Sequence, residues 1–145
     1  MHVVDTNVLL YAADRASPFH EACRTWLEHR RSQPERWFLT WGILYEFLRV
    51  VTHPRVLRTP WTSGGAWQFV EQLPASRSAA VLVETDRHHE VAGRVPAELP
   101  YVAGNLLHEM HTVILMREHG VRESVTRDAD FHRFRGVEVI DPVAL

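Results

Sequence analysis

Lysine is missing from this sequence of 145 residues, and all 16 basic residues are arginines. The formal net charge is only −2, so the chain lacks the strong basic excess of proteins that coat DNA. A single cysteine, Cys23, excludes an internal disulfide framework and favours a reducing compartment. Arginine can grip phosphate through two parallel hydrogen bonds, but biased codon usage in a GC-rich genome is the simpler explanation for the missing lysine.

Long apolar runs are also missing, because no stretch approaches the roughly 20 residues that a transmembrane helix needs. The opening residues lack the basic start and longer apolar stretch of a secretory signal peptide. Hydrophobic side chains nevertheless make up 46% of the chain, which is enough for a real core. No repeat, low-complexity tract or long linker divides the sequence. We therefore expect one domain over residues 1–145, in the cytoplasm and without membrane contact.

Short apolar runs alternate with segments of helical periodicity, a pattern typical of an α/β domain with a parallel sheet. Strands are expected at 2–5, 37–40, 79–84, 124–126 and 137–140. Helices are expected at 7–13, from Pro18 through Leu27, at 42–52, from a cap at Thr62 or Ser63 to Leu73, after a cap at Thr85, and at 105–119 before Gly120. A turn or helical turn is expected at 130–134.

Four acidic side chains stand beside apolar stretches, where an unpaired carboxylate is costly to desolvate. They are Asp5 after the first expected strand, Glu46 and Glu109 on expected helices, and Asp128 after a later expected strand. In parallel sheets, ligands gather at the carboxyl ends of the strands. Clustered carboxylates repel one another, and bound Mg²⁺ or Mn²⁺ removes that penalty because both cations prefer oxygen ligands. Such ions activate water and stabilise the charge on a phosphodiester during an in-line displacement.

Each acid also has a plainer interpretation, which the residues alone leave open. Asp5 can simply cap the helix that follows it. Glu46 can form a surface ion pair with an arginine three residues on. Glu109 can lie on the solvent side of its helix, and Asp128 and Asp130 are common turn residues. The spacing of all four acids along the α/β pattern favours a shared site.

In these residues the sequence resembles the PIN domains, specifically the VapC-like toxin ribonucleases of bacterial toxin–antitoxin pairs. The matching segments are Val3–Ala12, Leu39–Trp41, Glu46–Pro54, Gly104–Leu107, Glu118–Val121, Thr126–Phe131 and the closing Arg133-Phe134 to Asp141-Pro142. The opening Asp-Thr-Asn is a weak signal alone. All segments in order, over nearly the whole chain, are a strong one.

The resemblance implies a three-layer α/β/α fold with a short central parallel sheet. It implies Mg²⁺- or Mn²⁺-dependent cleavage of RNA, inhibition by a small cognate antitoxin that presents an arginine to the acidic pocket, and a homodimer. The implied catalytic residues are Asp5, Glu46, Glu109 and Asp128, of which Asp5, Glu109 and Asp128 are the implied metal ligands, with Asn7, Thr126 and Asp130 in support.

One position departs from the family pattern. Where the family usually has Asp followed by Ala-His, this chain has Glu109-Met110-His111. Glutamate keeps the charge but is one methylene longer, and designed metal sites tolerate errors of only about 0.5 Å. This departure motivates an alternative hypothesis, a catalytically impaired PIN domain that acts mainly as a protein-binding module. A third hypothesis is an unrelated α/β phosphohydrolase acting on small phosphoesters.

Ten histidines raise the question of zinc. His108 and His111 are three residues apart, whereas the zinc-protease motif places two histidines four apart, so a structural zinc site is not expected. Most histidines are expected at the surface or in ordinary polar contacts. Among the tryptophans, Trp41 and Trp67 are expected in the core or an interface, and Trp61 in contact with a partner.

Overall fold

The computed structural model describes residues 1–144, so Leu145, the last residue of the expected domain, lies outside the described residues. The strands are β1 (His2–Val4), β2 (Trp37–Thr40), β3 (Ala79–Leu82), β4 (Glu123–Val125) and β5 (Glu138–Ile140). The helices are α1 (Thr6–Ala13), α2 (His20–Ser32), α3 (Trp41–Val51), α4 (Ser63–Gln72), α5 (His88–Glu98) and α6 (Leu106–Glu118), with a short 3₁₀ helix η1 (Ala129–Arg133).

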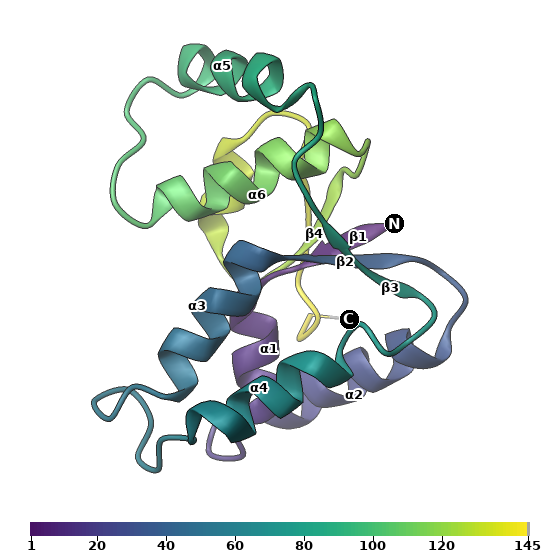
Figure 1. Cartoon of the computed structure of the whole chain (residues 1–145), viewed down its shortest axis with the longest axis vertical. Helices are drawn as coiled ribbons and strands as arrows, with labels where there is room; N and C mark the ends of the chain where they lie inside the picture. The colour runs from purple at the N-terminus through teal and green to yellow at the C-terminus, as the bar shows by residue number, and fades with distance from the viewer. Residues whose placement is uncertain (145) are drawn as a thin grey trace.

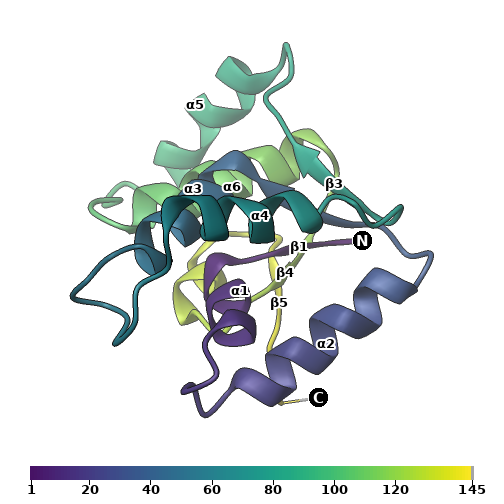
Figure 2. The same ribbon diagram turned by 60° about the horizontal axis from the view of Figure 1, so that its bottom comes forward.

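The five strands form one parallel sheet in the order β3-β2-β1-β4-β5. From β1 at the centre, the chain adds β2 and β3 on one side and then crosses to add β4 and β5 on the other. Helices α5 and α6 lie on one side of the sheet, and α1 and α2 lie on the other (Figures 1 and 2). The predicted three-layer α/β/α fold with a short central parallel sheet is confirmed.

Burial explains why the central strands contain so few polar residues. Every residue of β1 and β2 is buried, as expected for parallel strands that are covered on both faces. Helix α3 begins where β2 ends, because the Thr40 hydroxyl accepts a hydrogen bond from the Ile43 N–H at 3.1 Å. Helix α3 then packs against α1, α4 and α6, which brings its first turns close to the end of β1.

The predicted elements are confirmed in type and order, and most of their ends differ by one or two residues. Helix α2 is the exception, because it continues to Ser32, beyond the predicted stretch from Pro18 through Leu27. The predicted stop at Gly120 is also confirmed, since Gly120 has a φ of +68° directly after α6. The predicted cap at Thr85 is wrong. Helix α5 starts at His88 without a side-chain cap, and the Thr85 hydroxyl instead donates to Glu118 Oε1 at 2.6 Å.

Trp41 and Trp67 were expected in the core or in an interface, and their exposure excludes the core. Trp41 and Trp67 are 44% and 39% exposed and stack on each other with ring centroids 6.5 Å apart, so neither belongs to the core. Trp61 is partly buried and packs edge-on against Phe47 and Phe69. Within residues 1–144, no helix is long and apolar enough to cross a membrane.

Candidate active site

The carboxyl ends of β1 and β4 lie side by side at the point where the chain changes the direction in which it adds strands. The Asp5 N–H donates to the Val125 carbonyl at 3.0 Å, which ties the two strand ends together. Such a switch point leaves a crevice outside the strand ends, where open α/β sheets bind their ligands. Asp5 follows β1 directly, and Thr126 follows β4 directly.

Asp5 is held by three donors at the start of α1. Its Oδ1 accepts from the Thr6 N–H at 2.7 Å, so Asp5 is indeed the N-cap of α1. Its Oδ2 accepts from Asn7 Nδ2 at 2.8 Å and from the Thr126 hydroxyl at 2.7 Å. These contacts fix the direction of the carboxylate, so the cap role and a place in an acidic cluster coexist.

Thr126 connects three groups of the site through one buried hydroxyl. Besides donating to Asp5, the hydroxyl accepts from Asn7 Nδ2 at 2.8 Å and from the Asp128 N–H at 2.9 Å. Asn7 Oδ1 in turn accepts from the Arg127 N–H at 3.3 Å. The side chains expected to support the acids therefore do contact them.

Glu46 reaches the same region from α3. Its Oε2 accepts from the Thr6 hydroxyl at 2.9 Å, and its Oε1 lies 3.7 Å from Arg49 Nη2. The plainer interpretation of Glu46 is therefore also correct, although Arg49 is 66% exposed and such a pair contributes little to stability. Sequence reasoning did not single out Thr6, because its place next to the capping Asp5 indicated only a helix start.

Glu109 extends from α6 toward Asp5 rather than toward solvent. Its Oε2 is buried and has no hydrogen-bond partner among residues 1–144. Because Oε2 is buried and the side chain lies in the wall of a cleft with Asp5, the solvent-side interpretation of Glu109 is wrong. Burial raises the pKa of Glu109 to about 7. A hydrogen bond from its own backbone N–H lowers this pKa, whereas the negative charges of Asp5, Asp128 and Glu46 raise it further.

A small cleft lies between these side chains. It holds about 20 Å³ of space, and its wall contains Asp5, Gly42, Ile43, Glu46, His108, Glu109, His111, Thr112 and Phe131. This volume matches one water molecule or one ion. Asp128 lies beside the cleft and caps η1 by accepting from the Asp130 N–H at 2.9 Å.

Asp130 itself is exposed and lies 3.7 Å from Arg133 Nη1. The plainer interpretation of Asp128 and Asp130 as turn residues is therefore correct for both. Only Asp128 also acts on the cluster, since its charge raises the pKa of both Asp5 and Glu109.

A model of the PIN domain matches residues 2–137. The chain belongs to the PIN domain family. The ribonuclease VapC48 of Mycobacterium tuberculosis (strain CDC 1551 / Oshkosh) is 36% identical to this PIN domain over 138 residues, which cover 95% of this chain and 94% of the relative.

Solved structures show the same fold. VapC20 of Mycobacterium tuberculosis, described as a sarcin–ricin loop cleaving toxin, has a TM-score of 0.64 at 15% identity, covering 91% of this chain and 93% of VapC20. A toxin–antitoxin complex from Klebsiella pneumoniae contains a chain with a TM-score of 0.60 at 15% identity, covering 98% of each chain.

The acids of this PIN domain suit a hard divalent cation. All of their donors are carboxylate oxygens, which Mg²⁺ and Mn²⁺ prefer, and Glu109 Oε2 is a buried donor without a partner. Burial also raises the pKa of Asp5 to about 6; hydrogen bonds from Thr126 and Thr6 lower it, and the charges of Glu46 and Asp128 raise it further. Within residues 1–144, no three of the acids bring oxygens within 4.8 Å of one another, so joint ligation needs small side-chain rotations.

Proposed function

We propose that this PIN domain is a metal-dependent endoribonuclease and the toxin of a toxin–antitoxin pair. The observation that carries the proposal is the buried, unpartnered Glu109 Oε2, which shares a cleft with Asp5 and Glu46 at the switch point of the sheet. The ribonuclease name of VapC48, a relative over 95% of the chain, supports the same activity.

The residues divide into ligands and supports. Asp5, Glu109 and Asp128 hold Mg²⁺ or Mn²⁺, with Glu46 completing the catalytic set. A bound divalent ion supplies a Lewis acid that activates water and stabilises charge on the scissile phosphodiester. The Thr126 hydroxyl and Asn7 orient Asp5, as groups behind a metal ligand commonly do.

The two other hypotheses are not favoured. A pure protein-binding module has no need for a desolvated carboxylate cluster, which costs folding free energy unless a cation is bound. A phosphohydrolase for small phosphoesters would need a pocket that encloses its substrate, whereas the cleft holds only about 20 Å³. An RNA phosphodiester can instead approach such a cleft from outside.

Cleavage of a structured RNA tests this proposal. The purified protein is incubated with the RNA in Mn²⁺ or Mg²⁺, beside Asp5→Ala and a matched variant, Asp86→Ala, which removes an exposed aspartate outside the cleft. We expect cleavage by the wild type and Asp86→Ala, and none by Asp5→Ala or after chelation with EDTA. Equal rates for Asp5→Ala and the wild type would contradict the enzymatic role.

A cognate antitoxin is the proposed partner, supported by the structural likeness to a chain of the Klebsiella pneumoniae toxin–antitoxin complex. The chain offers an apolar groove of about 970 Å³ between the end of α1 and the loop after α3, and its wall includes Leu10, Tyr11, Val56, Leu57 and Trp61. A groove of this size and lining suits a peptide segment. An arginine that continues from this groove to the acids would pair with clustered carboxylates.

We also propose a homodimer in the cytoplasm. The exposed aromatic side chains Trp41, Tyr45 and Trp67 on α3 and α4 form a surface suited to a second copy. Sedimentation tests this at micromolar concentration, and a monomer there would contradict it. Cys23 is buried with its thiol free, which suits a reducing cytoplasm.

A further inference from the structure

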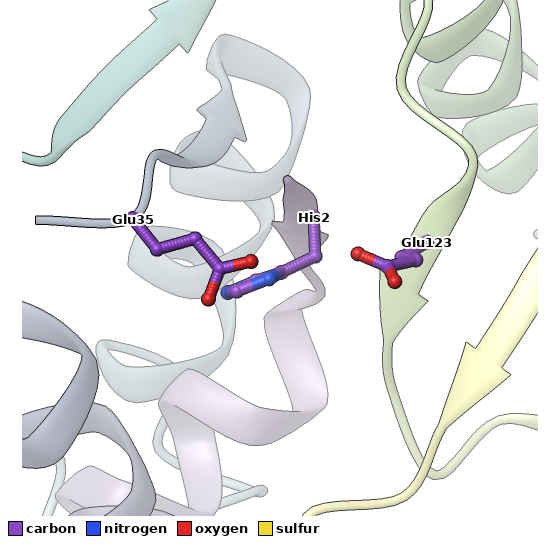
Figure 3. Close-up of side chains that lie close together, drawn as sticks. All are labelled: His2, Glu35 and Glu123. Carbon is purple, nitrogen blue, oxygen red and sulfur yellow. The ribbon is translucent and has the colours of Figure 1, made fainter. Parts of the chain in front are cut away.

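A second cluster of metal-binding residue types lies at the opposite end of the central strands. One ligand atom from each of His2, Glu35 and Glu123 lies within 4.8 Å of the other two. Figure 3 shows the His2 ring between the two carboxylate side chains. His2 opens β1 whereas Asp5 follows it, so about 10 Å of extended chain separates this cluster from the acidic cleft.

The strand register brings the three residues together. His2 on β1 pairs with Glu123 on β4 and with Trp37 on β2. Paired residues of neighbouring parallel strands point to the same face of a sheet, so the register places the His2 and Glu123 side chains next to each other. Glu35 lies two residues before β2 and reaches the same edge from the loop after α2.

His2 is the unusual member, because it is a polar side chain that is almost completely buried. Only 2% of it is exposed, and in the described part of the chain its Nε2 has no hydrogen-bond partner. Trp26 packs edge-on against the ring, with centroids 5.3 Å apart. Burial, with the charge of Arg30 as a second cause, lowers the pKa of His2 to about 4, so the ring is neutral at pH 7. A buried imidazole nitrogen without a partner costs free energy unless it gains a ligand.

The two carboxylates already converge on a cation. The α-amino group of Met1 lies 3.2 Å from Glu35 Oε1 and 3.3 Å from Glu123 Oε2. Glu35 Oε2 also accepts from Arg30 Nη1 at 2.5 Å, so Arg30 fixes the direction of this carboxylate. The position beside His2 is thus one where the protein holds positive charge.

We propose that His2, Glu35 and Glu123 form a second metal site, which takes Zn²⁺ or a similar borderline transition metal in place of the Met1 ammonium. Zinc binds both imidazole nitrogens and carboxylate oxygens, and water can fill the fourth position of a site with three protein ligands. The acidic cleft offers only oxygens and therefore favours Mg²⁺ or Mn²⁺, whereas imidazole favours zinc. The metal links β1, β4 and the segment before β2, and it stabilises the sheet.

Calorimetric titration of the chelated protein with ZnCl₂ tests the proposal. The protein is purified without a histidine tag, carries Asp5→Asn in the acidic cleft, and is kept in excess Mg²⁺. We expect one equivalent of Zn²⁺, and a drop in affinity of at least about 10-fold in Glu123→Gln and in Glu35→Gln. Glu90→Gln, an exposed glutamate on α5, is the matched control and should bind as tightly as its parent.

Two further readouts separate ligation from folding. Zn²⁺ should raise the melting temperature of the Asp5→Asn protein but not that of its Glu123→Gln derivative, and it should shift the NMR signal of a His2 ring nitrogen. Because His2 is buried, its signal is followed in place rather than removed by mutation. Absence of a zinc equivalent, or one that neither Glu123→Gln nor Glu35→Gln weakens, would overturn the proposal.

Discussion

The fold raises the pKa values of the Asp5 and Glu109 carboxyl groups, so each group holds its proton to a higher pH than in the unfolded chain. Burial raises the pKa of Asp5 from 3.8 to about 6 and that of Glu109 from 4.5 to about 7. An acid with a raised pKa binds more protons in the folded state than in the unfolded chain, so its contribution to stability is fully present at low pH and is lost as the pH rises through the folded pKa. At neutral pH the metal-free cleft is thus a source of instability, which a bound cation relieves.

The first prediction concerns this pH dependence. In EDTA, the free energy of unfolding of the wild type should fall relative to that of Asp5→Asn as the pH rises from about 4 to 6, by at most about 3 kcal/mol. His2 has the opposite sign, because its pKa is lowered to about 4 and its contribution grows as the pH rises to 6.5. Because both proteins contain His2, its contribution cancels in the difference between their free energies of unfolding. Chemical unfolding at several pH values measures the difference, and parallel pH profiles would contradict the assigned pKa of Asp5.

The second prediction concerns Glu109, the residue that departs from the family pattern. Because its carboxylate reaches the cleft and Oε2 has no other partner, Glu109→Gln should lower Mn²⁺ affinity and RNA cleavage by roughly 10- to 100-fold or more. Glu109→Asp should cleave at a rate within a few fold of the wild type. A large gain in Glu109→Asp would show instead that the longer side chain impairs the enzyme. Glu90→Gln controls for the loss of an exposed glutamate.

At the scale of elements, the site depends on the hydrogen bonds that join the carboxyl end of β1 to the carboxyl end of β4. The Thr126 hydroxyl touches Asp5, Asn7 and the Asp128 N–H, so it sets the position of groups that follow both strands. Thr126 has no exposed surface, and removing its hydroxyl leaves buried donors and acceptors unpaired.

The third prediction concerns the hydrogen bonds of the Thr126 hydroxyl. Thr126→Val keeps the shape of the side chain but should reduce cleavage by roughly 10- to 100-fold and lower the melting temperature. Thr126→Ser keeps the hydroxyl and should restore most of the activity. Cleavage assays and thermal melts of the two variants measure both effects. Equal activity of the valine and serine variants would contradict a positioning role for the hydroxyl.

The elements themselves were largely predictable from local pattern. Apolar runs indicated all five strands, and Gly120 and Thr62 marked helix ends that the structure confirms. Thr85 shows the limit of local signals, because Glu118 on α6 competes for its hydroxyl. For Trp41 and Trp67, helical periodicity left the core and an interface open, and only the structure shows that both side chains are exposed.

The candidate site was predictable to a similar degree. The acids stood out because they interrupt apolar stretches, and the structure places Asp5, Glu46 and Glu109 around one cleft. Their functional roles remain proposals. The cluster of His2, Glu35 and Glu123 was not predicted, because its members come from three segments that only the strand register joins. His2 looked like an ordinary strand residue.

At the scale of the whole molecule, the apolar groove and the acidic cleft are separate surfaces. Val56 lines the groove and is 55% exposed, whereas Val83 is similarly exposed, at 48%, but lies outside it. The fourth prediction is that Val56→Asp prevents co-purification with the proposed antitoxin, tested with the product of the neighbouring gene, because a charge would be buried in the interface. Val83→Asp should leave co-purification intact. Equal effects of the two variants would place the antitoxin elsewhere.

Asp5, Glu109 and Asp128 are the proposed ligands of the catalytic metal. Anomalous diffraction from crystals soaked in Mn²⁺ tests this proposal most directly, with the soaked protein assayed for RNA cleavage in parallel. We expect a manganese peak among the carboxylates of Asp5, Glu109 and Asp128, at about 2.1 Å from its ligands, and no such peak in Asp5→Asn. A protein that cleaves RNA in Mn²⁺ but binds the ion elsewhere, or binds it unchanged in Asp5→Asn, would show that these acids do not hold the catalytic metal.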